Sequence, residues 1–354
     1  MFGPYSLRDH GLLLSQRDRT EQTAQQILDA LAAPFRLKSE QVHVAGSIGI
    51  ALFPKDAADS EELMRNADHA MYRSKAGGRN RMTFFQPAMQ SSAMQRLILI
   101  AELRRALPED QLVLHYQPIA SLESGATVKA EALLRWRRPG RGLTSPVEFI
   151  AAAEDSGIIH ELGDWVFCEA AAAAARWSAL LRHDFQVGIN RSPIQFQPNT
   201  RGLDWVAHLR AAGIPSRYIS VEITEGVLLN LTESVEAQLD LFSQEGIEVA
   251  IDDFGIGYSS MSYLKRLDID CLKIDQSFVA GLGKDPTSTV ITETIIVMAH
   301  KLSMKVIAEG VETVLQRDWL RSYGCDYAQG FLFSHPLPAG QFEKRLEREM
   351  RRAC

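Results

Sequence analysis

The 354-residue sequence has few cysteines, no surplus of basic residues and no long apolar run. Its four cysteines are scattered without a CxxC pair, which argues against a disulfide framework and predicts reduced thiols. No apolar run is long enough to cross a membrane, and the first residues contain no apolar signal-peptide core. From these absences we expect a cytoplasmic protein without a membrane segment in this chain.

A basic surface is not expected either, because the net charge is −6 and the isoelectric point is near 5.9. Proteins that bind nucleic-acid polymers usually carry a positively charged face, so we expect no such partner. The net charge does not exclude binding of a small anionic ligand, since metal ions or single arginines can reverse the charge locally. Apolar residues make up 46% and charged residues 23%, which is typical of globular proteins.

The sequence pattern of residues 1–86 predicts a short α/β segment. The pattern indicates two helices and two strands: a helix over 21–35, a strand over 42–54, a helix over 60–78 and a strand over 81–85. Ser60 is the expected N-cap of the second helix. Residues 87–107 favour a helical connector to the rest of the chain.

The pattern changes over residues 108–350, where short β-like runs alternate with longer helical stretches. Intervals of about 30 residues between strands are typical of βα units. Roughly 240 residues of such units favour a (β/α)8 barrel, with a doubly wound open sheet as the structural alternative. The predicted fold class is therefore α/β, with a large domain behind a smaller one.

Polar residues recur near the ends of the predicted strands. Side chains alternate between the two faces of a strand, so in "SVEIT" Glu222 lies opposite Val221 and Ile223. In barrels, functional groups gather at the carboxyl ends of the strands. Taken alone, each of these polar residues is explained as well by a structural role as by a functional one. Together, six strands would bring the following residues around one opening: Glu131, Asn190, Glu222, Asp252, Asp253, Lys273 and Glu309.

Such a crowded acidic opening needs cations. Like charges about 4 Å apart repel by roughly 1 kcal/mol in water and about 4 kcal/mol at an effective dielectric constant near 20. Lys273 and Arg135 are too few to neutralise the acids, and oxygen ligands favour Mg²⁺ or Mn²⁺. The nine histidines show no paired spacing that would indicate zinc. The adjacent Asp252 and Asp253 predict two ions, an arrangement used in phosphodiester hydrolysis.

Nine short motifs carry a specific resemblance over about residues 97–346. In chain order they are "YQPI", "EALLRW", "SPVEFI", "INRSPIQF", "VEITE", "IDDFGIGYSSMSYL", "LKIDQSFV", "IAEGVET" and "QGFLFSHPLP". The segment resembles the EAL-domain family of cyclic di-GMP phosphodiesterases. The resemblance implies a modified (β/α)8 barrel with one antiparallel strand, here "LVLHYQPI" over 112–119. It also implies hydrolysis of cyclic di-GMP to linear pGpG with two Mg²⁺ or Mn²⁺ ions.

The same resemblance implies roles for individual residues. Lys273 is similar to the lysine that holds the attacking water, and Glu309 and Glu131 are the other implied catalytic residues. Glu225 resembles the glutamate that holds the loop after the aspartate pair. The implied metal ligands are Glu131, Asn190, Glu222, Asp252, Asp253 and Glu309. The implied substrate-binding residues are Gln117, Leu133, Arg135, Asp275, Glu312, Gln329 and Pro336.

Two positions depart from the family pattern. Ile256 stands where the family usually has threonine, so a hydroxyl that orders the loop is missing. Arg191 replaces an apolar residue in "NRS". We expect its side chain to point away from that of Asn190 and its effect to be modest.

The N-terminal piece resembles the second half of a GGDEF domain, the diguanylate cyclase module, but residues 1–19 resemble nothing in that family. The signature motif is absent, so we expect no cyclase activity. The leading hypothesis is a phosphodiesterase. A catalytically silent cyclic di-GMP receptor and a structural remnant are the alternatives, and a homodimer is expected by resemblance only.

Overall fold

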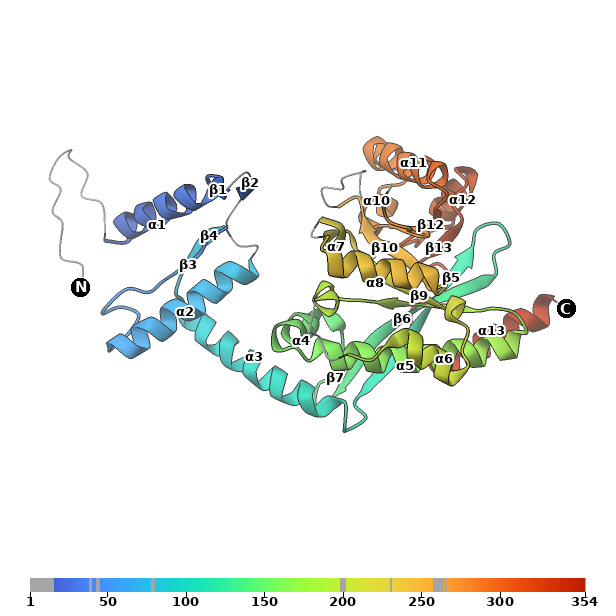
Figure 1. Cartoon of the computed structure of the whole chain (residues 1–354), viewed down its shortest axis with the longest axis horizontal. Helices are drawn as coiled ribbons and strands as arrows, with labels where there is room; N and C mark the ends of the chain where they lie inside the picture. Colours follow the sequence, from blue (N-terminus) through green and yellow to red (C-terminus); the bar gives the residue numbers. More distant parts are fainter. Residues whose placement is uncertain are drawn as a thin grey trace. The chain divides into compact units, whose positions relative to one another are not determined.

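The chain folds into two compact units, residues 1–99 and 100–354 (Figure 1). The computed structural model describes residues 16–37, 40–42, 45–77, 80–197, 202–229, 231–256, 264 and 266–353. None of the helices in these ranges combines the length and the hydrophobicity that a membrane span needs.

The first unit contains a two-stranded parallel sheet with a helix packed on it. Its elements are α1 (Gln16–Ala32), β1 (Phe35–Leu37), β2 (Glu40–Val42), β3 (Ser47–Ile50), α2 (Ser60–Ala76) and β4 (Arg81–Phe84). Strand β3 pairs with β4, and α2 approaches β3 closely because Gly49 has no side chain. A Cβ atom there would lie 2.0 Å from the carbonyl oxygen of Ala67.

Two details of this unit differ from the sequence prediction. The strand predicted over 42–54 is only four residues long in β3, and residues 43 and 44 lie outside the described part of the chain. The N-cap of α2 is Asp59 rather than Ser60, because the Asp59 carboxylate accepts a hydrogen bond from the backbone N–H of Glu62 at 2.8 Å. Helix α3 (Pro87–Ala106) follows, over nearly the range predicted for the connector.

The second unit is a closed eight-stranded barrel. Its strands are β5 (Leu112–Ser121), β6 (Thr127–Arg138), β8 (Gln186–Asn190), β9 (Ile219–Thr224), β10 (Glu248–Phe254), β11 (Cys271–Ile274), β12 (Lys305–Ala308) and β13 (Tyr327–Gln329). Strand β6 and strands β8 to β13 are parallel, whereas β5 is antiparallel to both of its barrel neighbours, β6 and β13. This confirms the predicted modified barrel and its one antiparallel strand. The short strand β7 (Gly142–Thr144) pairs antiparallel with β6, and β14 (Leu337–Pro338) pairs antiparallel with β5.

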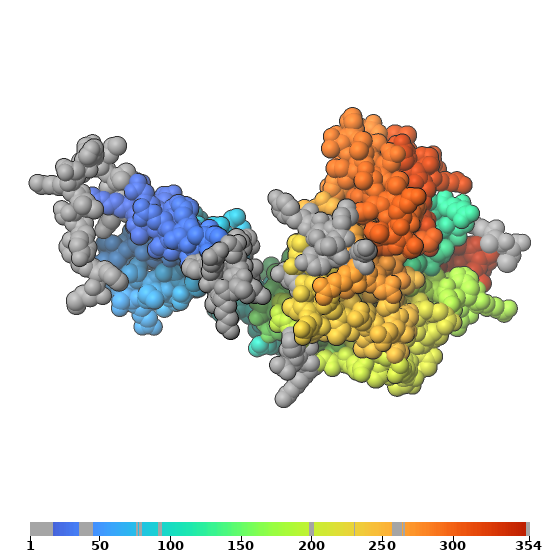
Figure 2. Space-filling model, turned by 45° about the horizontal axis from the view of Figure 1, so that its top comes forward, coloured from blue at the N-terminus to red at the C-terminus, as the bar shows by residue number. Residues whose placement is uncertain are grey.

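Helices surround the barrel (Figure 1). They are α4 (Ile150–Ser156), α5 (Ile159–Leu181), α6 (Trp205–Ala212), α7 (Glu225–Leu229), α8 (Glu233–Gln244), α10 (Gln276–Ala280), α11 (Pro286–Lys301), α12 (Val314–Ser322) and α13 (Ala339–Ala353). Figure 2 shows the same chain in space-filling form, coloured by residue number. The C-terminal helix α13 covers β5 through Phe342, whose ring packs against Tyr116 and Trp177. A short turn joins β5 directly to β6, so the end of the chain supplies the helix that this strand lacks.

Candidate active site

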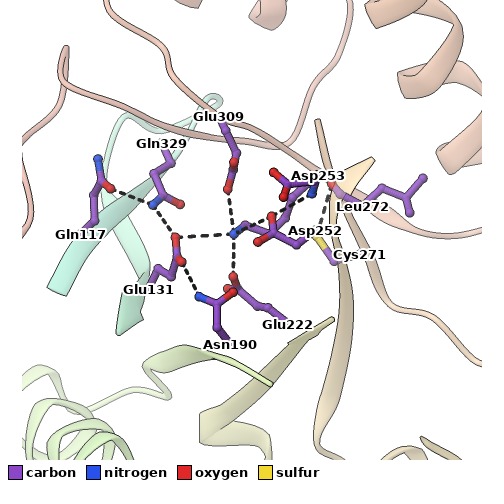
Figure 3. Close-up of polar contacts among 11 residues, drawn as sticks. Gln117, Glu131, Asn190, Glu222, Asp252, Asp253, Cys271, Leu272, Glu309 and Gln329 are labelled. Carbon is purple, nitrogen blue, oxygen red and sulfur yellow. Dashed lines mark hydrogen bonds and ion pairs between the residues drawn. The ribbon is translucent and has the colours of Figure 1, made fainter. Parts of the chain in front are cut away.

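Lys273 lies at the centre of the barrel opening, and its side chain is completely buried. Four carboxylates surround its ammonium, and they come from β9, β10, β6 and the residue after β12. Figure 3 labels these acids as Glu222, Asp252, Glu131 and Glu309. The distances from Nζ are 2.5 Å to Glu222, 2.7 Å to Glu309, 3.1 Å to Asp252 and 3.5 Å to Glu131. Strands far apart in the sequence therefore bring these predicted residues together.

Glu131 is the best-oriented of these acids, because both of its oxygens accept hydrogen bonds. The amide nitrogens of Asn190 and Gln329 each donate to it at 2.7 Å (Figure 3). The same nitrogen of Gln329 lies 3.0 Å from the side-chain oxygen of Gln117. The barrel register explains the grouping, since Gln117 pairs with Glu131 and Asn190 pairs with Glu222 on neighbouring strands.

Asp252 and Asp253 reach the same opening because the strand is irregular there. In a regular strand, adjacent side chains point to opposite faces. Here the register shifts between Ile251 and Phe254, and Asp253 has a positive φ of 53°. Its backbone N–H donates to Asp252 Oδ1 at 3.0 Å. Carboxylate oxygens of Asp252, Asp253 and Glu309 consequently lie within 4.8 Å of one another.

Gly188 makes room for one of these acids, and Glu225 holds the backbone that follows the aspartate pair. Gly188 on β8 gives space to Glu222, since a Cβ atom there would lie 2.1 Å from Glu222 Oε1. Beyond the aspartate pair, the backbone N–H of Gly255 donates to the buried Glu225 carboxylate at 3.2 Å. The exposed Ile256 follows, and the predicted loop motif over 257–263 lies outside the described residues.

The charges of the site are unbalanced. Burial disfavours the ammonium of Lys273, but Glu131 and the other three carboxylates outweigh burial and raise its pKa well above its usual value. Burial raises the pKa of Glu309 to about 7 and also raises that of Asp253, with repulsion from Asp252 adding in both cases. With all five acids ionised, the cluster holds four more negative charges than Lys273 neutralises. Two divalent cations would balance that excess.

A cavity of about 240 Å³ opens above the acids. Six of the predicted site residues line it: Gln117, Glu131, Asp252, Glu309, Glu312 and Gln329. Leu133, Arg135, Asp275 and Pro336 are not among its described lining residues. Asp275 instead caps α10 by accepting from the backbone N–H of Ser277 at 2.8 Å, and a guanidinium nitrogen of Arg135 donates to the carbonyl of Leu134.

The cavity also contains residues that the sequence interpretation did not single out. These are Gln276, Gly310, Gly330 and Phe331. Phe331 lies within the motif "QGFLFSHPLP", and its aromatic side chain directly after the glycine that follows β13 was the one clue available. Gln276 had no comparable clue, since it follows Asp275 at the start of α10.

Arg191 lies outside the acidic cluster. Its guanidinium lies 4.7 Å from the ring centre of Phe196, 4.4 Å from that of Trp205 and 5.3 Å from that of Phe242. One nitrogen donates to Gln238 at 2.9 Å, while Nε is buried without a hydrogen-bond partner. Burial lowers the pKa of Arg191 to about 10, so the side chain stays charged at neutral pH.

Two different protein families match the two units of the chain. The family model "EAL domain" matches residues 100–336, and the model "Diguanylate cyclase, GGDEF domain" matches residues 11–81. The second match begins at residue 11, so the prediction that nothing before residue 20 belongs to that family is wrong for residues 11–19.

Two curated bacterial proteins match nearly the whole chain. The chain is 39% identical over 334 residues to the bifunctional diguanylate cyclase/cyclic di-GMP phosphodiesterase MucR of Pseudomonas aeruginosa, covering 93% of this chain and 48% of MucR. It is 40% identical over 333 residues to the cyclic di-GMP phosphodiesterase PdeR of Escherichia coli, covering 94% of this chain and 50% of PdeR. The chain thus spans about half the length of these relatives.

Solved structures agree with this similarity. The phosphodiesterase part of P. aeruginosa MucR, in complex with c-di-GMP, superposes with a TM-score of 0.66 at 38% identity. The match covers 69% of this chain and 99% of that one. The EAL enzyme Bd1971 with cAMP and cyclic di-GMP bound gives a TM-score of 0.69 at 31% identity, covering 80% of this chain and 74% of that one.

Proposed function

The chain belongs to the EAL-domain family, and on this basis we propose that it hydrolyses cyclic di-GMP to linear pGpG. The observation that carries the proposal is the convergence of five carboxylates, one amide and one buried ammonium at the barrel opening. Because the donors are oxygen atoms of carboxylates and an amide, they suit hard divalent cations, Mg²⁺ or Mn²⁺.

Two overlapping groups of residues would hold these ions. Glu131, Asn190, Glu222 and Asp252 are the proposed ligands of the first, and Asp252, Asp253 and Glu309 those of the second. When bound, such ions neutralise the phosphodiester charge and lower the pKa of a water molecule. The fit rests on the excess negative charge and on the absence of histidine or cysteine from this cluster.

The protein's own residues would orient the reaction. Lys273 presents a fixed ammonium among the acids and is the proposed holder of the attacking water. Gln329 and Asn190 hold Glu131 in one orientation through both carboxylate oxygens. Gln117 and Glu312, on the cavity wall, are proposed substrate contacts, as are Leu133, Arg135, Asp275 and Pro336, which lie outside the described lining.

A receptor that binds cyclic di-GMP without turnover is the competing function. The ligand set is complete in this chain, which favours hydrolysis over silent binding. The test incubates the full chain and Mn²⁺ with cyclic di-GMP and separates the products by chromatography. We expect pGpG, its loss in EDTA and its recovery with added Mn²⁺, and Glu131→Gln should reduce turnover by at least about 100-fold. Tight binding without pGpG would support the receptor instead.

The remaining proposals concern assembly and the first unit. A homodimer stays a prediction, to be checked by sedimentation of the full chain.

We propose that residues 1–86 form the GGDEF-like part, residues 87–107 the connector and residues 108–350 the phosphodiesterase domain. Because the GGDEF signature motif is missing from the sequence, we propose that the first unit does not synthesise cyclic di-GMP.

A further inference from the structure

Phe331 is a large apolar side chain that is 54% exposed on the wall of the acidic cavity. Isolated exposed apolar residues are common and need no explanation by themselves. This one shares its cavity with Glu131, Asp252 and Glu309. It also follows Gln329 by two residues, and the amide of Gln329 contacts Glu131. An apolar ring therefore stands directly beside the proposed phosphodiester site.

His335 supports one side of this ring. The two ring centres are 4.0 Å apart and the ring planes are tilted by 34°. Such a close, tilted ring contact favours a defined orientation for both rings. Because more than half of Phe331 is exposed in spite of this contact, a further flat group can still reach it.

The backbone that carries the pair is tightly held. The N–H of Leu332 donates to the carbonyl of Val311, and the N–H groups of Phe333 and Ser334 donate to the carbonyl of Gly330, all at 3.0–3.1 Å. Gly330 lies so close to Val311 that a Cβ atom would meet its carbonyl oxygen at 2.2 Å. The backbone between the two rings is thus held before any ligand binds, which lowers the cost of ordering it on binding.

We propose that Phe331, supported by His335, is a specificity-determining residue that stacks on one nucleobase of the substrate. The inference rests on the proposed function, because it places the phosphodiester at the carboxylates and leaves an attached nucleoside to extend along the cavity wall. Every base has a flat π face, so stacking selects nucleotide diesters over diesters without bases, whichever base they carry. Hydrogen-bonding groups elsewhere on the wall, such as Glu312 and Gln276, would then distinguish one base from another.

The test compares Phe331→Leu with the wild-type full chain in Mn²⁺. Loss of one aromatic stacking partner changes affinity by about 5- to 150-fold, so we expect KM for cyclic di-GMP to rise by that factor and kcat to fall much less. A cyclic dinucleotide with 2-aminopurine in place of one guanine provides a direct signal. Its fluorescence should be quenched on binding to the wild type and remain bright on binding to Phe331→Leu.

Three further variants separate stacking from general damage. Phe331→Tyr keeps the aromatic face and should restore KM to within about threefold of the wild type, while His335→Ala should raise KM by a smaller factor than Phe331→Leu. Phe53→Leu is the matched control, since Phe53 is 59% exposed in the other unit and should leave KM unchanged.

An unchanged KM in Phe331→Leu, or 2-aminopurine that stays bright on the wild type, would overturn the stacking role. Wild-type protein that never forms pGpG would contradict the proposed function instead. In that case the fluorescence titration still decides the stacking role on its own.

Discussion

The ammonium of Lys273 lies 2.5 Å from the carboxylate of Glu222, and both side chains are almost completely shielded from solvent. A buried ion pair of this kind gives little net stability, because removing two charges from water offsets their attraction. Removing one partner, however, leaves the other charge buried and unpaired. The pair is therefore best understood as part of a site that divalent cations complete.

This relationship predicts the behaviour of Lys273→Met. Without metal, four carboxylates lose their common partner, and we expect the free energy of unfolding to fall by about 3–5 kcal/mol. Saturating Mn²⁺ should raise the melting temperature of this variant more than that of the wild type, because the added charge replaces the ammonium. Turnover should fall by at least about 100-fold. Calorimetry with and without Mn²⁺ checks the first two points, with Lys301→Met, on the exposed end of α11, as the control.

Gly188→Ala tests how much space Glu222 needs. The added methyl group would lie 2.1 Å from Glu222 Oε1, so the carboxylate has to move away from its position beside Lys273. We expect a several-fold weaker apparent affinity for Mn²⁺ and a lower kcat, measured by activity against metal concentration. Gly340→Ala is the matched control, because a Cβ atom there meets nothing within 4 Å. Equal behaviour of the two variants would show that the close approach of Gly188 has no role in the site.

Two substitutions of Arg191 should differ in their effect on the free energy of unfolding. Leucine fits the enclosure of Phe196, Trp205 and Phe242, and it removes a buried charge that has an unpaired Nε. Leucine also leaves the Gln195 carbonyl and the Gln238 side-chain oxygen without this donor, so Arg191→Leu should lower the free energy of unfolding by about 1–2 kcal/mol. Arg191→Ala leaves an empty space and should lower it by about 2–4 kcal/mol. Urea denaturation of both variants measures the difference, and a larger loss in the leucine variant would contradict this account.

The contacts of Asp326 should make its contribution to the stability of the fold depend on pH. Burial opposes its ionisation, but hydrogen bonds from Lys305 at 2.8 Å and from Val306 N–H at 3.0 Å, with His300 Nε2 at 2.8 Å, outweigh burial and lower its pKa. The ionised form therefore stabilises the folded state above the unfolded pKa of about 3.9, and this contribution is lost as the pH falls through the lower folded value. Because Lys305 is largely exposed, screening limits the effect to about 1 kcal/mol.

Asp326→Asn should accordingly be less stable than the wild type at pH 7, and the difference should shrink below about pH 4. Chemical denaturation at several pH values measures it. Asp318→Asn is the control, because Asp318 pairs with Arg317 on the exposed side of α12 and should show no such trend. A difference for Asp326→Asn that stays constant down to pH 2 would rule out this role of the ionised carboxylate.

Much of the barrel and its acidic centre could be predicted from the sequence, because both follow from regular patterns. The spacing of βα units favoured a barrel over a doubly wound open sheet, and the resemblance to the EAL-domain family added the antiparallel first strand. Strand alternation placed Glu222 and Lys273 on one inner surface. Local irregularities could not be predicted in this way. Alternation alone separates Asp252 from Asp253, and only the shifted register and positive φ bring both carboxylates to one opening. The aromatic surroundings of Arg191 likewise come from helices distant in the sequence.

The most direct test of the central claim locates the metal ions themselves. Crystals of the full chain grown with Mn²⁺ would be measured at a wavelength where manganese scatters anomalously. We expect two anomalous peaks at the barrel opening, with Asp252 bound to both and with Glu131, Asn190 and Glu222 around one of them. Peaks elsewhere, or an opening without manganese at a Mn²⁺ concentration that supports turnover, would contradict the claim that these oxygen atoms hold the catalytic ions.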